Sequence, residues 1–275
     1  MTLSHRNIIF KAGIAASLGI LILIIIASFT VLPLYPELQG QAETRPSGLF
    51  LSIHIVNPVP WAPFAVMIAA IAYALITMIL IFFFFEKTHA PEILFVAFFA
   101  LSFAMEAARI TLPLRTALNL PGVFPILGYR LLLFGRYFGL FSLFTSSVCA
   151  SGLELQRQGT SILILTLSAL TIALGRPVDG FQWDTSLCML AGYDSMFTLV
   201  ETAVMLITTA SFVVSAQFRG SPEYVFIGIG SFLALMGRYI FLRADTWLSP
   251  LPGLILLCVG TWFICKQLHR VYLWL

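Results

Sequence analysis

Charged residues are scarce in this chain of 275 residues: Asp, Glu, Lys and Arg make up 10% of it, and 60% of it is hydrophobic. Soluble globular domains carry about 25% charged residues, so this chain cannot cover its surface with water-compatible side chains. The net charge of +3 is spread out, without a basic or acidic block, and gives no reason to expect nucleic acid as a partner. The composition excludes an ordinary soluble protein and indicates membrane lipids as partners.

Residues that attach cofactors or bind metals are also few. The four histidines, His5, His54, His89 and His269, lie outside the apolar runs or at their ends, so no pair is placed to hold a haem within the membrane. No lysine lies in the interior of an apolar run to form a Schiff base, and neither H-E-x-x-H nor G-x-x-x-x-G-K-[ST] occurs. We therefore expect no cofactor, no metal site and no catalytic residue of a known motif.

Cysteines and soluble domains are scarce as well. Only Cys188, of four cysteines, falls in a predicted outer loop. A disulfide bond outside the cell would therefore have no second cysteine. The segments between apolar runs are short; the longest is Pro33–Pro60. This excludes a receptor whose own loops carry a kinase or cyclase domain.

Long apolar runs are abundant. A run of about 20 such residues spans the hydrocarbon core of a bilayer as a helix. We identify eight, at Ile8–Leu32, Trp61–Phe85, Pro91–Leu112, Ile126–Ala150, Thr160–Leu174, Ser195–Ala216, Pro222–Leu242 and Leu251–Cys265. The sequence predicts an all-α, polytopic transmembrane helical bundle of about eight spans in a single membrane domain, 1–275. A seven-span arrangement, with the short fifth run re-entrant, is the alternative.

The distribution of Lys and Arg predicts the orientation. All three lysines, Lys11, Lys87 and Lys266, fall on one side of the predicted bundle, which we assign to the cytoplasm together with both termini. The first apolar run is too long for the core of a signal peptide, so we expect it to remain as a helix. The expected location is a bacterial cytoplasmic (inner) membrane.

Two parts of the chain resemble each other. Pro91-Glu92 aligns with Pro222-Glu223, and Leu120-Pro121-Gly122 aligns with Leu251-Pro252-Gly253 without gaps. A four-plus-four duplication with halves 1–150 and 151–275 would place two parallel repeats around an axis along the membrane normal. The alternative is that Pro-Glu is an ordinary helix start and Pro-Gly an ordinary break between helices.

Five of the charged residues inside the predicted spans form a candidate cluster. A helix rises about 1.5 Å per residue, which places all five in the outer half of the membrane. They come from four spans: Glu106, Arg109, Arg136, Glu201 and Arg238. A charge in mid-membrane costs about 2.5–3.5 kcal/mol on insertion scales, so we predict that these side chains face inward as a buried cluster.

Several pairings within this cluster are open. Glu106 and Arg109 are three residues apart and can pair on one helix, which would leave Arg136 or Arg238 to Glu201 or to a bound ligand. Arg109 and Arg238 could instead extend to the lipid headgroups. Arg136 stands between Gly135 and Gly139, a spacing that permits close helix approach, so it could form a purely structural ion pair.

Three classes of function fit these residues. The first is a transporter, or the sensing subunit of a separate output protein, whose arginines bind an anionic or amphiphilic small molecule. The second is a structural or assembly subunit that docks a protein partner through small residues such as Gly13, Ser17, Gly135, Gly139, Gly228 and Gly230. The third is a lipid-modifying enzyme that uses Glu106 or Glu201 as acid or base. No stretch carries the motif of a known family.

Overall fold

The computed structural model describes residues 3–34, 61–86, 88, 90–152, 158–242 and 250–273. Within these residues, eight helices are long and apolar enough to cross a membrane, which confirms the predicted all-α, multi-span fold. Most of the loop Pro33–Pro60 lies outside the described residues, as do His54 and His89 and the charges at Lys87 and Arg243.

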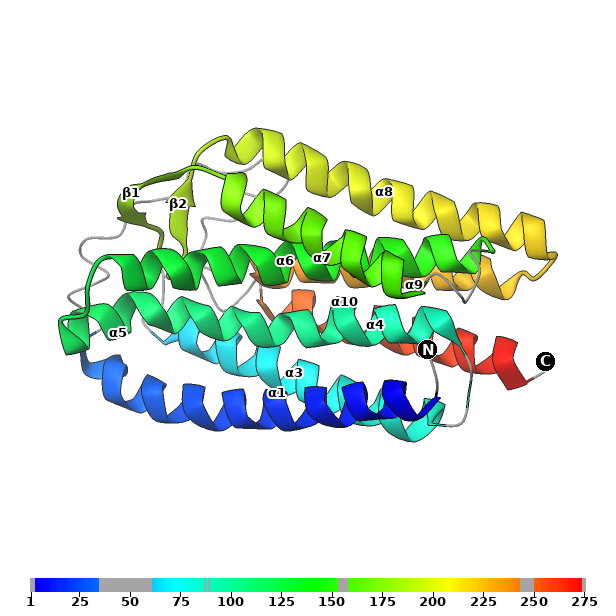
Figure 1. Ribbon diagram of the computed structural model, residues 1–275, viewed down its shortest axis with the longest axis horizontal. Helices are drawn as coiled ribbons and strands as arrows, with labels where there is room; N and C mark the ends of the chain where they lie inside the picture. The colour runs from blue at the N-terminus through cyan, green and yellow to red at the C-terminus, as the bar shows by residue number, and fades with distance from the viewer. Residues whose placement is uncertain are drawn as a thin grey trace.

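The helices run antiparallel to their sequence neighbours and form one bundle (Figure 1). Their bounds are α1 (Leu3–Val31), followed by the short η1 (Leu32–Leu34), α3 (Ala62–Phe85), α4 (Pro91–Ser102) with η2 (Phe103–Ile110) and α5 (Thr111–Leu118), α6 (Val123–Ala150), α7 (Gln158–Gly175), α8 (Asp194–Arg219), α9 (Glu223–Leu242) and α10 (Pro250–Leu273). The fifth apolar run is the continuous helix α7, which packs along α6. The seven-span alternative is therefore wrong.

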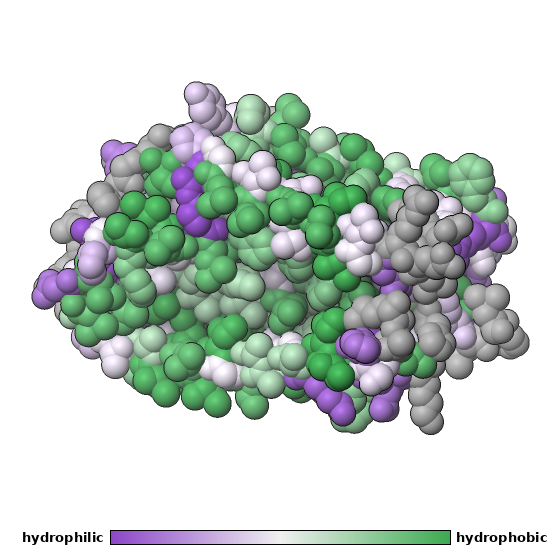
Figure 2. Space-filling view, in the orientation of Figure 1, coloured by the Kyte–Doolittle hydropathy of each residue, from purple (hydrophilic) through white to green (hydrophobic). Residues whose placement is uncertain are grey.

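Two ends of the bundle can be distinguished. Strands β1 (Val178–Trp183) and β2 (Met189–Ala191) form an antiparallel hairpin at what we call the hairpin end, while α1 begins and α10 ends at the opposite, termini end (Figure 1). The surface between the two ends is largely hydrophobic in the view of Figure 2, and hydrophilic residues gather toward both ends. This distribution is the one that a bilayer requires of a spanning bundle.

The helices differ in how far they are buried. The span formed by α4, η2 and α5 is the central one, because 78% of its most apolar 18-residue stretch is buried inside the bundle. Helix α8 is peripheral, because only 11% of the corresponding stretch is buried. Figure 1 shows α8 along one edge of the bundle. A helix with so little buried surface is expected to contact lipid along most of its length.

The central span is not a continuous α-helix. Residues Phe103–Ile110 form the 3₁₀ segment η2, just before Pro113 in α5. Proline lacks an N–H and its ring collides with the carbonyl four residues earlier, here Arg109, which disturbs the α-helical pattern in the preceding turn. Residues three apart eclipse each other in a 3₁₀ helix, so Glu106 and Arg109 lie one above the other. The proposed duplication would align this span with α9, which is a continuous α-helix without a 3₁₀ segment. The duplication therefore remains a prediction.

Small residues bring helices of this chain together. A Cβ atom on Gly135 would lie 2.4 Å from the Cβ of Met105, and one on Gly139 would lie 2.2 Å from Ser102 Oγ. Gly13, Gly228 and Gly230 likewise face other helices of the same chain. The small-residue faces expected to dock a partner are thus occupied within the bundle.

We predict that Gly260→Leu destabilises the fold by about 1–3 kcal/mol or more, as overpacking does. A Cβ at Gly260 would lie 2.4 Å from the backbone nitrogen of Ala234, so α9 and α10 would have to separate. Thermal unfolding of detergent-purified protein measures the effect. Gly19→Leu is the control, because a Cβ at that position meets nothing within 4 Å; equal melting temperatures for both variants would contradict the proposed close contact.

Candidate functional site

The centre of the polar cluster is the carboxylate of Glu106. Arg109 Nη2 lies 2.6 Å from Oε2, and Arg136 holds both oxygens, with Nε 2.8 Å from Oε1 and Nη2 3.2 Å from Oε2. The Glu106 and Arg109 side chains are buried, and that of Arg136 is 18% exposed. We call these three residues the ion triad. Glu106 therefore pairs with two arginines from two spans, not with Arg109 alone.

Backbone carbonyls bind the remaining guanidinium groups. Arg109 donates to the carbonyl oxygens of Leu242 at 3.1 Å and Ser186 at 3.5 Å. Arg238 donates to the carbonyl oxygen of Arg136 at 2.6 Å. Arg109 is 1% exposed and Arg238 is 6% exposed, so the idea that they extend to the headgroups is wrong. These contacts join the central span, α6 and α9.

The hairpin covers this cluster. Asp184 Oδ1 accepts hydrogen bonds from the backbone N–H groups of Ser186 and Cys188 and from the Ser186 hydroxyl. An aspartate that bonds to the backbone two residues on is typical of a tight turn, and here it aims the Ser186 carbonyl at Arg109. Cys188 Sγ lies 3.5 Å from Arg136 Nη2. The sequence did not predict these strands, because they are short and carry little alternation.

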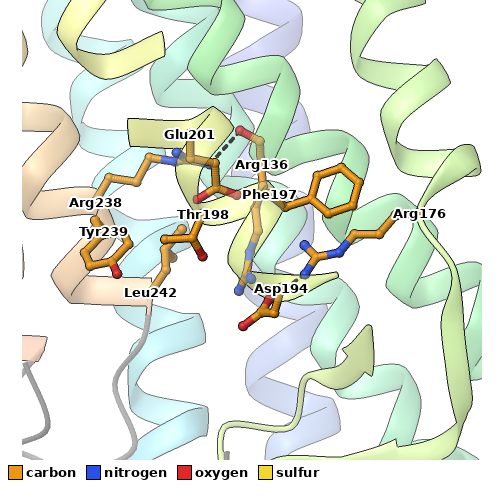
Figure 3. A pocket seen from close by; sticks show the side chains of 9 residues that line it. All are labelled: Arg136, Arg176, Asp194, Phe197, Thr198, Glu201, Arg238, Tyr239 and Leu242. Atoms are coloured by element: carbon orange, nitrogen blue, oxygen red, sulfur yellow. Dashed lines mark hydrogen bonds and ion pairs between the residues drawn. The ribbon is translucent and has the colours of Figure 1, made fainter. Parts of the chain in front are cut away.

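A small polar cavity lies beside the ion triad, with a volume of about 50 Å³. We call it the head cavity. Figure 3 shows Arg238 and Tyr239 reaching it from one side and Arg176 from the other, with Arg136 between them. Its lining consists of Arg136, Arg176, Asp194, Phe197, Thr198, Glu201, Arg238, Tyr239 and Leu242.

Arg176 and Asp194 also line the cavity; they lie between two predicted spans and are not among the five predicted cluster residues. Their side chains pair at 2.5 Å, and the Arg176 guanidinium stacks over the ring of Phe197 at 4.6 Å. Arg130 fixes this corner by donating to the carbonyl oxygens of Ala173, in the last turn of α7, and of Arg176, directly after it. The only sequence signal was the helix-ending Gly175-Arg176-Pro177.

Glu201 differs from the other acidic groups of the cavity. In the described ranges of the chain, no Arg or Lys nitrogen lies within 4 Å of its carboxylate. Of the pairings left open, Glu201 therefore forms neither the one with Arg136, which binds Glu106 instead, nor the one with Arg238. Arg238 is close enough to attract Glu201 electrostatically, but the two side chains do not form an ion pair.

An apolar groove adjoins the head cavity. It lies between α6, α8 and α9 and has a volume of about 280 Å³; we call it the chain groove. Glu201, Arg238 and Tyr239 line both spaces. The other groove residues are Leu140, Thr202, Met205, Leu206, Phe232, Leu235 and Met236. The arrangement places charged groups at one end of a hydrophobic slot.

This geometry limits the chemistry. Both Glu106 oxygens are bound by guanidinium groups, so Glu106 is not placed to exchange a proton with a substrate. Glu201 alone of the two proposed acid–base residues faces a cavity. Across the part of the chain that the structure describes, no three His, Cys, Asp or Glu side chains are grouped to bind a metal ion.

A second polar cluster occupies the termini end. The Glu92 side chain is fully buried, accepts a hydrogen bond of 2.6 Å from Tyr272 Oη, and lies 3.9 Å from Arg219 Nη2. Arg219 also donates to Tyr224 Oη at 2.8 Å. The sequence placed Glu92 in the proposed repeat or in an ordinary helix start and not in a polar cluster, because its partners come from α8 and α10, far away in the sequence.

The chain was compared with known proteins. No protein-family model matches it, and no curated protein matches it.

We predict that Glu106→Gln lowers the stability of the bundle by about 3–5 kcal/mol, the usual cost of removing one partner of a buried ion pair. Two guanidinium groups would lose their shared carboxylate. Thermal unfolding in detergent measures the loss. Glu86→Gln, at an exposed side chain, is the control; a Glu106→Gln protein as stable as the control would show that the ion triad is dispensable.

For the second cluster, we predict that Tyr272→Phe costs about 1.5–3 kcal/mol, as expected for a hydrogen bond to a charged group. The variant removes the donor to Glu92 Oε2. Tyr193→Phe, at a side chain exposed to 72%, controls for loss of a hydroxyl group. Chemical or thermal unfolding of both variants is the measurement, and the absence of a difference between them would contradict the assigned role of Tyr272.

Proposed function

We propose that this protein binds an amphiphile, as a transporter or as the sensing subunit of a separate output protein. The polar end of the ligand occupies the head cavity, and its hydrocarbon chain lies in the chain groove. The observation that carries this proposal is that the two spaces share Glu201, Arg238 and Tyr239. A ligand at these residues would contact charge and hydrocarbon at the same time.

The chemistry of the lining supports this proposal. Arg presents a planar fork that suits carboxylate and phosphate groups, and Arg136, Arg176 and Arg238 reach the head cavity from three different elements. Ionised groups within a membrane span are expensive and usually mark a ligand or ion pathway. The chain groove is near the lower end of the roughly 300–1,000 Å³ of ligand sites, which suits one hydrocarbon chain better than two.

The position of α8 supports a route for the ligand through the bilayer. The groove residue Leu206 is 55% exposed on the surface that would face lipid. An amphiphile already in the membrane can therefore reach the groove sideways, between α8 and α9. We further propose a bacterial inner membrane with cytoplasmic termini, which would place the head cavity toward the outer side.

A lipid-modifying enzyme is the second candidate, and it rests on one observation. Glu201 is a carboxylate in the head cavity without an ion-pair partner among the described residues, so it could act as a general base. Turnover would appear as a change in the mass of the bound lipid.

We predict that Thr202→Phe weakens the binding of single-chain phospholipids by about tenfold, because the larger ring occupies the chain groove without changing any charge. A tenfold change corresponds to about 1.4 kcal/mol. Lysophosphatidylethanolamine and lysophosphatidylglycerol of equal chain length are the probes, measured by native mass spectrometry on the detergent-purified chain.

Thr171→Phe, at an exposed position of α7, is the matched control and should bind as the unmodified chain does. Equal binding by Thr202→Phe and the control would overturn the assignment of the groove. A purified chain that binds neither probe would instead favour a structural subunit.

A further inference from the structure

Only some of the charged side chains that line the head cavity have an ion-pair partner. Arg136 is paired with Glu106, and Arg176 is paired with Asp194. Arg238 and Glu201 are different: among the described residues, neither has an oppositely charged atom within 4 Å. These same two residues line both the head cavity and the chain groove. One cation and one anion therefore stand together at the entrance of the groove without contacting each other.

The contacts of Arg238 explain why it does not close onto Glu201. Its Nη2 donates to the carbonyl oxygen of Arg136 at 2.6 Å, which holds the guanidinium against α6. Glu201 belongs to α8, on the other wall of the cavity, and Figure 3 shows its carboxylate directed into the space between Arg238 and Arg136. This hydrogen bond between α9 and α6 holds the Arg238 guanidinium away from the Glu201 carboxylate on α8.

We propose that the ligand is a zwitterionic amphiphile with one hydrocarbon chain, whose phosphate or carboxylate group binds Arg238 and whose ammonium group binds Glu201. This inference rests on the proposed function. A purely anionic head group would lie beside the Glu201 carboxylate and be repelled, and a purely cationic one would meet Arg238. A zwitterion gives each of these charges a partner, so discrimination comes from repulsion as well as attraction.

The cavity also selects the kind of ammonium group. Its volume of about 50 Å³ is small, and the hydroxyl oxygens of Thr198 and Tyr239 share the lining with Glu201. A primary ammonium has three N–H donors for these oxygens, whereas a trimethylammonium group is larger and has none. The ligand class is therefore a single-chain amphiphile with a primary amine.

The test compares head groups on one chain length. The full chain, purified in a maltoside detergent, is titrated with lysophosphatidylethanolamine, lysophosphatidylcholine and lysophosphatidylglycerol, and binding is measured by native mass spectrometry. We expect the ethanolamine lipid to bind at least tenfold more tightly than the other two. 2-Aminohexadecanoic acid, which carries a primary ammonium and a carboxylate in place of the phosphate, shows whether Arg238 also accepts a carboxylate.

Variants of Glu201 and Arg238 separate the contribution of each charge to lipid binding. Glu201→Gln should weaken binding of the ethanolamine lipid at least tenfold and leave the glycerol lipid unchanged or tighter, since a like charge is removed. Arg238→Gln should weaken both lipids. Glu86→Gln is the control for loss of a carboxylate away from the site. If Glu201→Gln does not fold, Glu201→Asp keeps the charge and should keep the order of preference at lower affinity.

The outcomes distinguish this inference from the proposed function. Equal binding of the ethanolamine and glycerol lipids, or a Glu201→Gln variant with unchanged preference, overturns the zwitterion while amphiphile binding stands. If the chain binds all of the lipids and Thr202→Phe weakens none of them, the binding reflects ordinary lipid contact. This result overturns both the zwitterion inference and the proposed function.

Discussion

The hydrogen-bonded ion pairs of Glu106 hold the helices together at the hairpin end of this bundle. One buried carboxylate receives two guanidinium groups, from its own span and from α6. Arg109 in turn contacts the end of α9 and the hairpin through backbone carbonyls, and the Arg136 carbonyl binds Arg238. In a membrane interior no water replaces a lost partner, so each of these contacts depends on the others.

The site proposed for a ligand lies beside this network rather than within it. The charged groups of the ion triad are paired with one another, which suits a structural role. Glu201 belongs to α8, the helix with the least buried surface, which flanks the head cavity and the chain groove. A further apolar cavity of about 320 Å³ lies between α6, α7 and α8. The helix that contributes the unpaired carboxylate is thus also the least closely packed one.

Polar contacts at both ends hold α8 to the bundle. Asp194 at its start pairs with Arg176, and Arg219 at its end contacts Tyr224 and lies near Glu92. Between these ends the helix has few buried residues, namely Thr208, Phe212, Ser215 and Ala216. The helix is thus fixed at its ends and loosely packed between them.

The sequence by itself determined the class of fold and the number of spans, because the cost of exposing polar backbone to lipid leaves long apolar helices as the solution. It also identified the five charges of the cluster, of which Glu106, Arg109 and Arg238 are buried, since a charge deep in such a run is conspicuous. Pairing was different: Glu106 and Arg136 meet across two spans, and Arg176, Asp194 and Glu92 looked like loop or helix-start residues. Only the tertiary structure decided which charges are satisfied and which remain unpaired. Ion pairs depend on distances of a few ångströms between helices, and local sequence spacing does not specify those distances.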